Sequence, residues 1–356
     1  TTQEYFSYYH LDSARQKGYT GKGITIALID APVDLSDPEL AGANIVDKSR
    51  CTLEATQTSS SHGNWMAAIL VSQNYGVAPD ATLYTYQTAT DGAASSGSCK
   101  QGDKELDKIA DLINQAIDDG AQIISISLSS TDRDKALKWA ITRALSKGVI
   151  IVSSMGNNAA DENNAHLAWW SGVVGVSAIH TDGTFASYSS WGNGVTTAAI
   201  GGPVTMRNIS SGETMTTEGT SNATALTSGM LALALQKWPE ATPNQILQSL
   251  VHSGLNPNHE WNQYTGYGAA ALGSLVNDDP SQYPDENPII QKQGGSEPTA
   301  EEVADYTDGL INPIETTLLP DSYVYRGADD TVLLYHTDTE LKNPLHLGTS
   351  PRYHRK

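Results

Sequence analysis

Short runs of branched apolar residues alternate with longer stretches of helical periodicity between Gly23 and about Val276. The apolar runs predict strands at 24–29, 82–86, 122–128, 149–154 and 173–178, and their nearly continuous Ile and Val content is typical of strands buried on both faces. Helical spacing predicts helices at about 63–72, 104–119, 132–147, 221–236 and 243–252. This alternation predicts an α/β fold in three layers, with a mostly parallel central sheet and helices on both faces.

The composition changes after about Val276. Residues 277–356 hold 8 of the 15 prolines, and their 15 acidic against 6 basic residues contribute −9 of the formal net charge of −19. Helical periodicity is weak there, apart from a stretch near 301–306. We therefore predict one domain at 1–276 and a Pro-rich, acidic extension or linker at 277–356, which wraps the domain or joins it to something else and has no core of its own.

The charge balance excludes some classes of partner. The 356 residues include 21 Lys and Arg against 40 Asp and Glu. Because phosphate groups are neutralised by clustered cations, this balance argues against nucleic acid and against docking on an anionic membrane. No apolar run approaches about 18 residues, so no transmembrane helix is predicted. The polar and aromatic first nine residues do not resemble a signal peptide, which was either removed or never present.

Two cysteines, Cys51 and Cys99, are too few for a structural zinc site and enough for one disulfide. Both lie in polar, Ser-rich sequence, where we favour a disulfide; two reduced thiols in a cytosolic protein are the alternative. The carboxylates of Asp34, Asp37 and Glu39 are close in sequence, and we interpret them as a solvated loop. We predict no metal site and no cofactor.

Four polar residues stand where catalytic groups are often found. Ser221 follows Gly219-Thr220 and precedes a helical apolar pattern, so it lies in the positive field of a helix N-terminus, which suits a nucleophile. Asp30 ends an apolar strand, His62 begins a helical pattern, and Asn157 follows a strand end. Taken singly, each has a structural alternative: a helix cap for Ser221, a strand-end cap for Asp30, a polar helix start for His62 and a turn former for Asn157.

The order of these residues and their neighbouring motifs resemble the subtilisin-like serine proteases, the subtilase family. The matching segments are Gly21-Lys22-Gly23, Ile29-Asp30, Ser61-His62-Gly63, Gly76-Val77-Ala78-Pro79, Ser125-Ile126-Ser127-Leu128, Ser154-Met155-Gly156-Asn157, Ser187-Tyr188-Ser189-Ser190 and Gly219-Thr220-Ser221. They span about residues 15–272 in one colinear order. The resemblance is specific because the order Asp, His, Asn, Ser along the chain is one of several triad orders found in unrelated families. The resemblance implies a subtilisin-like three-layer fold.

The resemblance also implies a role for each residue. Ser221 would attack the scissile carbonyl, His62 would accept and return the proton, and Asp30 would orient His62. The Asn157 side chain and the Ser221 backbone N–H would form the oxyanion hole. The primary specificity pocket would be walled by Ser127-Leu128-Ser129 and Ser154-Met155-Gly156. These segments carry no carboxylate, so we expect small or medium uncharged residues before the cut, with the Ser129 side chain narrowing the mouth.

Several positions depart from the family's pattern. Asp30 is followed by Ala31-Pro32 instead of a small hydroxyl residue and Gly, which removes one hydrogen bond expected at the Asp30 carboxylate. Asn64-Trp65 replaces Thr-His after His62-Gly63, and Asn222-Ala223-Thr224-Ala225 replaces Met-Ala-Ser-Pro. The Asn-rich loop that holds the family's strong calcium ion is absent between Ala67 and Gly76, so we expect no such site.

The function expected from the resemblance is a secreted or cell-envelope serine endopeptidase acting on peptide or protein substrates. A protease-fold scaffold with weak or no activity is a second hypothesis, and a processing or transpeptidating enzyme with narrow substrate specificity is a third. The loop cysteines and the Pro-rich extension also resemble the mycosins, proteases attached to type VII secretion systems. In that case the extension at 277–356 would serve a secretion-system or envelope partner.

Overall fold

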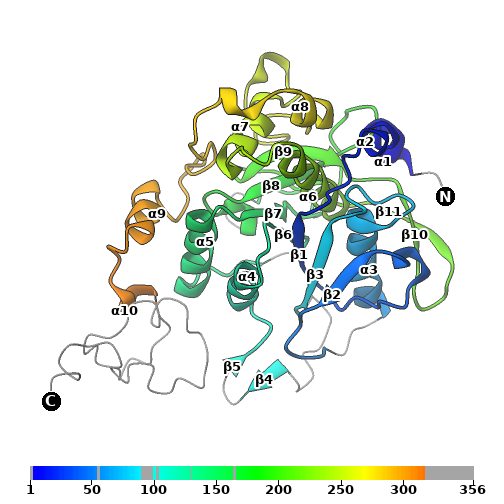
Figure 1. Cartoon of the computed structure of the whole chain (residues 1–356), viewed down its shortest axis with the longest axis horizontal. Helices are drawn as coiled ribbons and strands as arrows, with labels where there is room; N and C mark the ends of the chain where they lie inside the picture. Colours follow the sequence, from blue (N-terminus) through cyan, green and yellow to red (C-terminus); the bar gives the residue numbers. More distant parts are fainter. Residues whose placement is uncertain are drawn as a thin grey trace.

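The computed structural model describes residues 3–53, 57–89, 99–101, 104–128, 130–162 and 166–316. Its centre is a seven-stranded parallel sheet in the order β2-β3-β1-β6-β7-β8-β9 (Figure 1). The strands of this sheet are β1 (Thr25–Asp30), β2 (Asn44–Asp47), β3 (Thr82–Gln87), β6 (Ile123–Ile126), β7 (Ile150–Ser154), β8 (Val174–Ile179) and β9 (Val195–Ile200). The five predicted strands are its five central members, and the predicted α/β class is confirmed.

Two short antiparallel ribbons lie outside the sheet. They are β4 (Lys100–Gln101) with β5 (Lys104–Glu105), and β10 (Val204–Arg207) with β11 (Thr214–Thr217). The first ribbon corrects the sequence-based prediction of a helix from 104, because Lys104–Glu105 pairs as a strand and the helix begins only at Ile109.

Helices cover both faces of the sheet (Figure 1). On one face, Ile26 and Leu28 of β1 lie in a hydrophobic core with α3 and α6. On the other face, Ala27 and Ile29 lie in a second core with α4 and α5. This alternation follows from the period of two along a strand. The α-helices are α1 (Glu4–Tyr8), α2 (Leu11–Gln16), α3 (Gln57–Val71), α4 (Ile109–Asp118), α5 (Lys135–Lys147), α6 (Thr220–Lys237), α7 (Pro243–His252), α8 (Leu272–Asn277), α9 (Ala300–Thr307) and α10 (Pro313–Thr316). Single 3-10 turns are η1 (Pro38–Leu40), η3 (Leu167–Trp169), η4 (Pro257–His259) and η5 (Pro280–Gln282).

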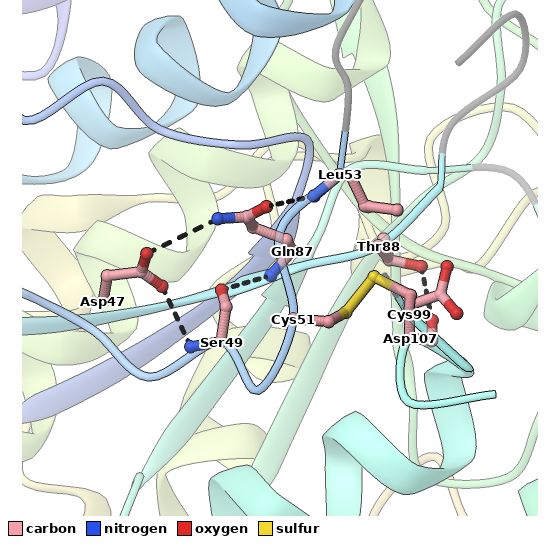
Figure 2. The surroundings of a disulfide bond; sticks show 8 residues. All are labelled: Asp47, Ser49, Cys51, Leu53, Gln87, Thr88, Cys99 and Asp107. Atoms are coloured by element: carbon pink, nitrogen blue, oxygen red, sulfur yellow. Dashed lines mark hydrogen bonds between the residues drawn. A yellow bond between two sulfur atoms is a disulfide. The ribbon is translucent and has the colours of Figure 1, made fainter. Parts of the chain in front are cut away.

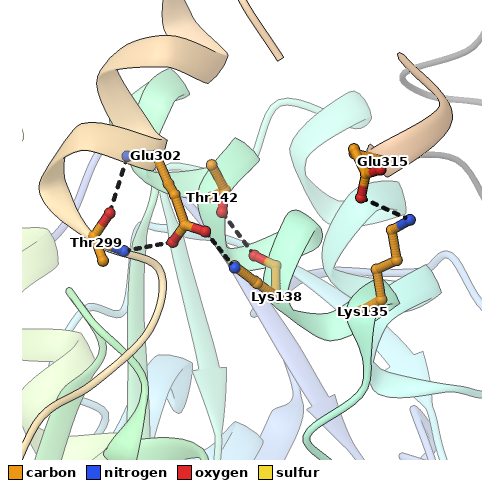
Figure 3. A network of polar contacts seen from close by, with 6 residues as sticks. All are labelled: Lys135, Lys138, Thr142, Thr299, Glu302 and Glu315. Atoms are coloured by element: carbon orange, nitrogen blue, oxygen red, sulfur yellow. Dashed lines mark hydrogen bonds and ion pairs between the residues drawn. The ribbon is translucent and has the colours of Figure 1, made fainter. Parts of the chain in front are cut away.

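The described part of the C-terminal extension lies against the domain. Helix α9, near the weak pattern at 301–306, packs on α5, where the Tyr306 ring stacks on Trp139 with centroids 6.1 Å apart. Lys138 of α5 pairs with Glu302, and Lys135 Nζ lies 3.3 Å from Glu315 Oε2 (Figure 3). Residues 277–316 therefore add a layer to the domain surface without forming a core of their own. The domain boundary at 276 stays a prediction, and residues 317–356 lie outside the described residues.

Candidate active site

Asp30 and His62 are in direct contact at the carboxyl end of the sheet. Asp30 is the last residue of β1 and only 1% exposed, and its Oδ1 lies 2.7 Å from His62 Nδ1. The Ala31 backbone N–H donates to the same Oδ1 over 2.7 Å. His62 lies within α3 and not at its start, because that helix begins at Gln57. The pair thus joins the end of the strand to the helix that crosses beside it.

Gly63 explains how α3 comes so close to the loop after β1. A Cβ at this position would lie 2.4 Å from the Ala31 carbonyl oxygen and 2.9 Å from that of Pro32. Real Cβ atoms do not approach backbone oxygens so closely, so only glycine lets His62 reach Asp30 at this separation. The His62-Gly63 dipeptide therefore has a packing reason as well as a chemical one.

The second carboxylate oxygen of Asp30, Oδ2, is buried and has no hydrogen-bond partner within the part of the chain that the structure describes. Ala31, which follows it, has no side-chain hydroxyl to donate. This orphaned oxygen fits the lost hydrogen bond that the sequence led us to expect. A buried, unpaired acceptor on a carboxylate is costly, so this arrangement of Asp30 lowers the stability of the fold.

The electrostatics of the pair favour a charged imidazole. Burial of the His62 ring disfavours its charged form, but the Asp30 carboxylate and the hydrogen bond to it outweigh that effect, so the pKa of His62 is raised above its ordinary 6.5. Its side chain is still 26% exposed, so the free edge of the ring is accessible. An imidazole in this setting can act as a general base and then, once protonated, as a general acid.

Ser221 lies in the first turn of α6, as predicted. Its hydroxyl donates to the Ser127 carbonyl over 3.1 Å, and the Ser127 hydroxyl donates to the Ser221 carbonyl over 3.1 Å. This reciprocal pair ties the start of α6 to the segment that follows β6. In this conformation the Ser221 proton points to Ser127 O, so attack on a substrate would require the hydroxyl to turn toward His62.

Asn157 is held against the residue that precedes Ser221. Its Oδ1 accepts from the Thr220 backbone N–H over 2.8 Å and from Thr220 Oγ1 over 2.9 Å. The Gly156 N–H in turn donates to Thr220 Oγ1 over 3.2 Å. Because both contacts use the amide oxygen, the exposed amide group keeps its Nδ2 hydrogens for another acceptor. Sequence reasoning missed this orienting role of Thr220, although its place beside Ser221 pointed to it.

The predicted pocket residues lie at the ends of β6 and β7. Ser127, Ser154, Met155 and Gly156 are buried, and Leu128 is half-buried. Ser129 lies outside the described residues, so its effect on the pocket stays a prediction.

A model of the subtilase family, peptidase S8, matches residues 21–268. The chain belongs to the subtilase family. It is 29% identical over 253 residues to the thermostable alkaline protease of Halalkalibacterium halodurans, a match that covers 68% of this chain and 65% of that protein. It is 30% identical over 276 residues to Subtilisin Savinase of Lederbergia lenta, covering 74% of this chain and 93% of that one. Among longer relatives, it matches 41% of the length of fervidolysin of Fervidobacterium pennivorans at 29% identity.

Solved structures show the same subtilase fold. MycP1 from Mycobacterium smegmatis superposes with a TM-score of 0.65 at 22% identity, covering 84% of this chain and 89% of that one. The prenylagaramide maturation protease PagA superposes with a TM-score of 0.61 at 24% identity, covering 75% and 97%. These likenesses establish the fold, and the mycosins are therefore among the structural neighbours of this subtilase.

Two of the departures from the family's pattern have local structural roles. The Asn64 side chain is fully buried and holds the loop after β1, because its Oδ1 accepts from Asp34 N over 2.7 Å and its Nδ2 donates to Asp34 O and Asp37 Oδ2. Asn222 Nδ2 donates to the Gly201 carbonyl over 3.0 Å. Both residues support the backbone around the site.

The predicted disulfide between Cys51 and Cys99 is present, with the Cα atoms 5.0 Å apart. It joins the segment after β2 to the segment before β4, close to the end of β3 (Figure 2). Within the described residues, no group of three or more His, Cys, Asp or Glu side chains is placed so that it could hold a metal ion. Over the same ranges, none of the helices has the length and apolar character needed to cross a bilayer.

Proposed function

We propose that this subtilase is a serine endopeptidase that works through an acyl-enzyme on Ser221. The observation that carries the proposal is the Asp30–His62 contact of 2.7 Å at the carboxyl end of the sheet, where Ser221 lies in the first turn of α6. A buried carboxylate bonded to Nδ1 fixes the tautomer of the imidazole and leaves Nε2 as the base.

The reaction then follows from the groups present. Ser221 Oγ attacks the carbonyl carbon of the peptide while His62 takes the hydroxyl proton. The oxyanion is stabilised by the Asn157 amide and the Ser221 backbone N–H at the positive end of α6. His62 returns the proton to the amine nitrogen as the C–N bond breaks. Water then attacks the ester, again with His62 as base, and restores Ser221.

The disulfide favours a protein that works in an oxidising compartment, so we place the enzyme outside the cytosol, secreted or at the cell envelope. The fold shared with MycP1 from the ESX-1 type VII secretion system supports a secretion-system or envelope partner as the finer form of this proposal.

The test is the intact mass of the protein after treatment with a serine-directed fluorophosphonate, with the Ser221→Ala variant as the matched control. We expect one adduct on the parent and none on the variant. Equal labelling of both would refute the assignment of Ser221.

An internally quenched peptide then tests the reaction class. Hydrolysis gives a free carboxylate, and a transpeptidating enzyme gives an amide when an amine is added, so mass spectrometry of the products distinguishes the two. A labelled enzyme that turns over no peptide would favour the scaffold reading.

A further inference from the structure

Lys292, in the C-terminal extension, inserts its side chain into the domain. The residue is 9% exposed, and its ammonium donates hydrogen bonds to the backbone carbonyls of Ala168, Val173 and Gly194, the last over 3.1 Å. Within the described residues no carboxylate pairs with it. Burial lowers the pKa of Lys292 to about 7.

The backbone around Lys292 is fastened to the same region. Gly172 N donates to Ile289 O over 2.9 Å, and Ser171 N donates to Glu297 O over 2.9 Å. The hydroxyls of Ser171 and Ser296 lie 2.8 Å apart. The segment 289–297 therefore covers the turn at 168–173, with the ammonium at the centre of the contact.

Two of the three carbonyls come from residues in or next to the side-chain cluster around Met155. The side chains of Met155, Ala168 and Val195 form a small buried cluster of their own, and Val195 directly follows Gly194. These backbones are already as close as they can be, because a Cβ on Gly194 would lie 2.5 Å from the Ala168 carbonyl oxygen.

A second line of contacts reaches the residue before Asn157. His166 precedes η3 and is 6% exposed, and a Cβ on Gly156 would lie 2.9 Å from its Nε2. Residues 166–173, which include the turn that Lys292 holds, thus contact Met155 through Ala168 and Gly156 through His166.

Three carbonyl dipoles that point at one buried position repel one another unless a cation lies between them. Without the ammonium, these oxygens would be left unpaired in a buried space, and the turn at 168–173 and the backbone at Gly194 would have to separate to reach water. Met155 and Gly156 would lose the wall against which they pack.

We propose that Lys292 is a positioning residue for the active site: its ammonium draws together the carbonyls of Ala168, Val173 and Gly194 and so fixes Met155 and Gly156, which wall the proposed substrate pocket. This inference rests on the proposed protease function and makes the extension part of the catalytic unit.

The test compares two variants of the full chain. Lys292→Ala removes the ammonium, and Lys138→Ala removes the partner of Glu302, another anchor of the extension, which lies on α5 and pairs with α9 instead of the turn. Peptide cleavage is measured per site titrated with the fluorophosphonate, so that unfolded protein is not counted. We expect kcat/KM to fall tenfold to a hundredfold in Lys292→Ala, mostly through KM, and to change less than twofold in Lys138→Ala.

Rescue by a small cation separates positioning from general loss of stability. The missing part of the side chain corresponds to n-propylammonium, which should restore a large share of kcat/KM to Lys292→Ala, whereas n-propanol at the same concentration should not. An unchanged KM in Lys292→Ala, or the same loss in Lys138→Ala, would overturn the proposal. If Lys292→Ala does not fold, Lys292→Met keeps the aliphatic stem and removes only the charge, with the same expectation for KM.

A second measurement distinguishes failure of the positioning role of Lys292 from failure of the proposed protease function. If the parent is neither labelled nor active, that function fails, and the positioning role is then read from amide hydrogen exchange. In that case exchange at 154–157 and 168–173 should be at least tenfold faster in Lys292→Met than in the parent and unchanged in Lys138→Ala. Equal exchange in all three proteins would refute the positioning role.

Discussion

Removing the disulfide tests how much of the stability depends on the crosslink between Cys51 and Cys99. The two residues are 48 positions apart, and the chain-entropy relation for a loop of this size gives about 4 kcal/mol at 25 °C. The native structure should lose little, because hydrogen bonds hold the same segment: Leu53 N donates to Gln87 Oε1 over 3.0 Å, and Gln87 N donates to Ser49 Oγ over 2.9 Å (Figure 2). The effect therefore falls mainly on the unfolded chain.

Unfolding entropy sets the change in melting temperature. At about 2.1 cal/mol/K per residue, about 300 folded residues give roughly 0.6 kcal/mol/K, so a loss of about 4 kcal/mol lowers Tm by about 6 °C. We would compare Ser221→Ala, which cannot digest itself, with the same protein carrying Cys51→Ser and Cys99→Ser, by calorimetry and urea unfolding. Reductant should lower the Tm of the first protein by the same amount and leave the second unchanged, and a calcium chelator should change neither. An unchanged Tm in the double variant would show that the entropic reasoning fails here.

Three further predictions concern the proposed catalytic residues and the residue that follows Asp30. His62 must be neutral to act as the base, and its pKa is raised, so kcat/KM of the parent should rise with pH through a midpoint above 6.5. Asp30→Asn removes the charge that raises the pKa of His62, so it should lower this midpoint and reduce kcat by about 10⁴. Asn157→Ala should lower kcat by a factor of about 10² to 10³ with little change in KM, as measured on a quenched peptide, since an oxyanion donor acts in the transition state. Ala31→Ser offers a hydroxyl to the unpaired Asp30 Oδ2 and should raise the unfolding free energy by about 1 kcal/mol in the Ser221→Ala background, as judged by urea unfolding.

The central strands could be predicted because burial on both faces selects continuous Ile and Val. The two edge strands could not. β2 is mostly exposed and has only two apolar residues, and β9, although buried, is built from Thr and Ala around two larger side chains. Edge strands have fewer neighbours to specify their side chains, so their sequence signal is weaker. The start of α4 was predicted too early because Lys104–Glu105 continues the polar pattern of a helix but pairs with the strand before it.

The order of catalytic residue types was visible in the sequence, but the contacts that orient them were not. The Asp30–His62 contact forms where the end of a strand meets a helix at the carboxyl end of a parallel sheet. By contrast, the Ser221 hydroxyl is bonded to a backbone carbonyl, and Asn157 is oriented largely by a backbone N–H. Every residue carries such backbone groups, so no residue type identifies the partner.

The same reason explains why the extension looked like a linker. Lys292 has Pro288, two glycines and Glu297 within six residues in the sequence, a composition that is typical of solvated chain, and a lysine in such sequence is normally exposed. The features that make Lys292 different are three carbonyl oxygens contributed by Ala168, Val173 and Gly194, whose own side chains are apolar or absent. A cation site made only from backbone has no signature in the residues that form it. It becomes visible when the turn and the extension lie side by side, and the same contact joins the extension to the domain.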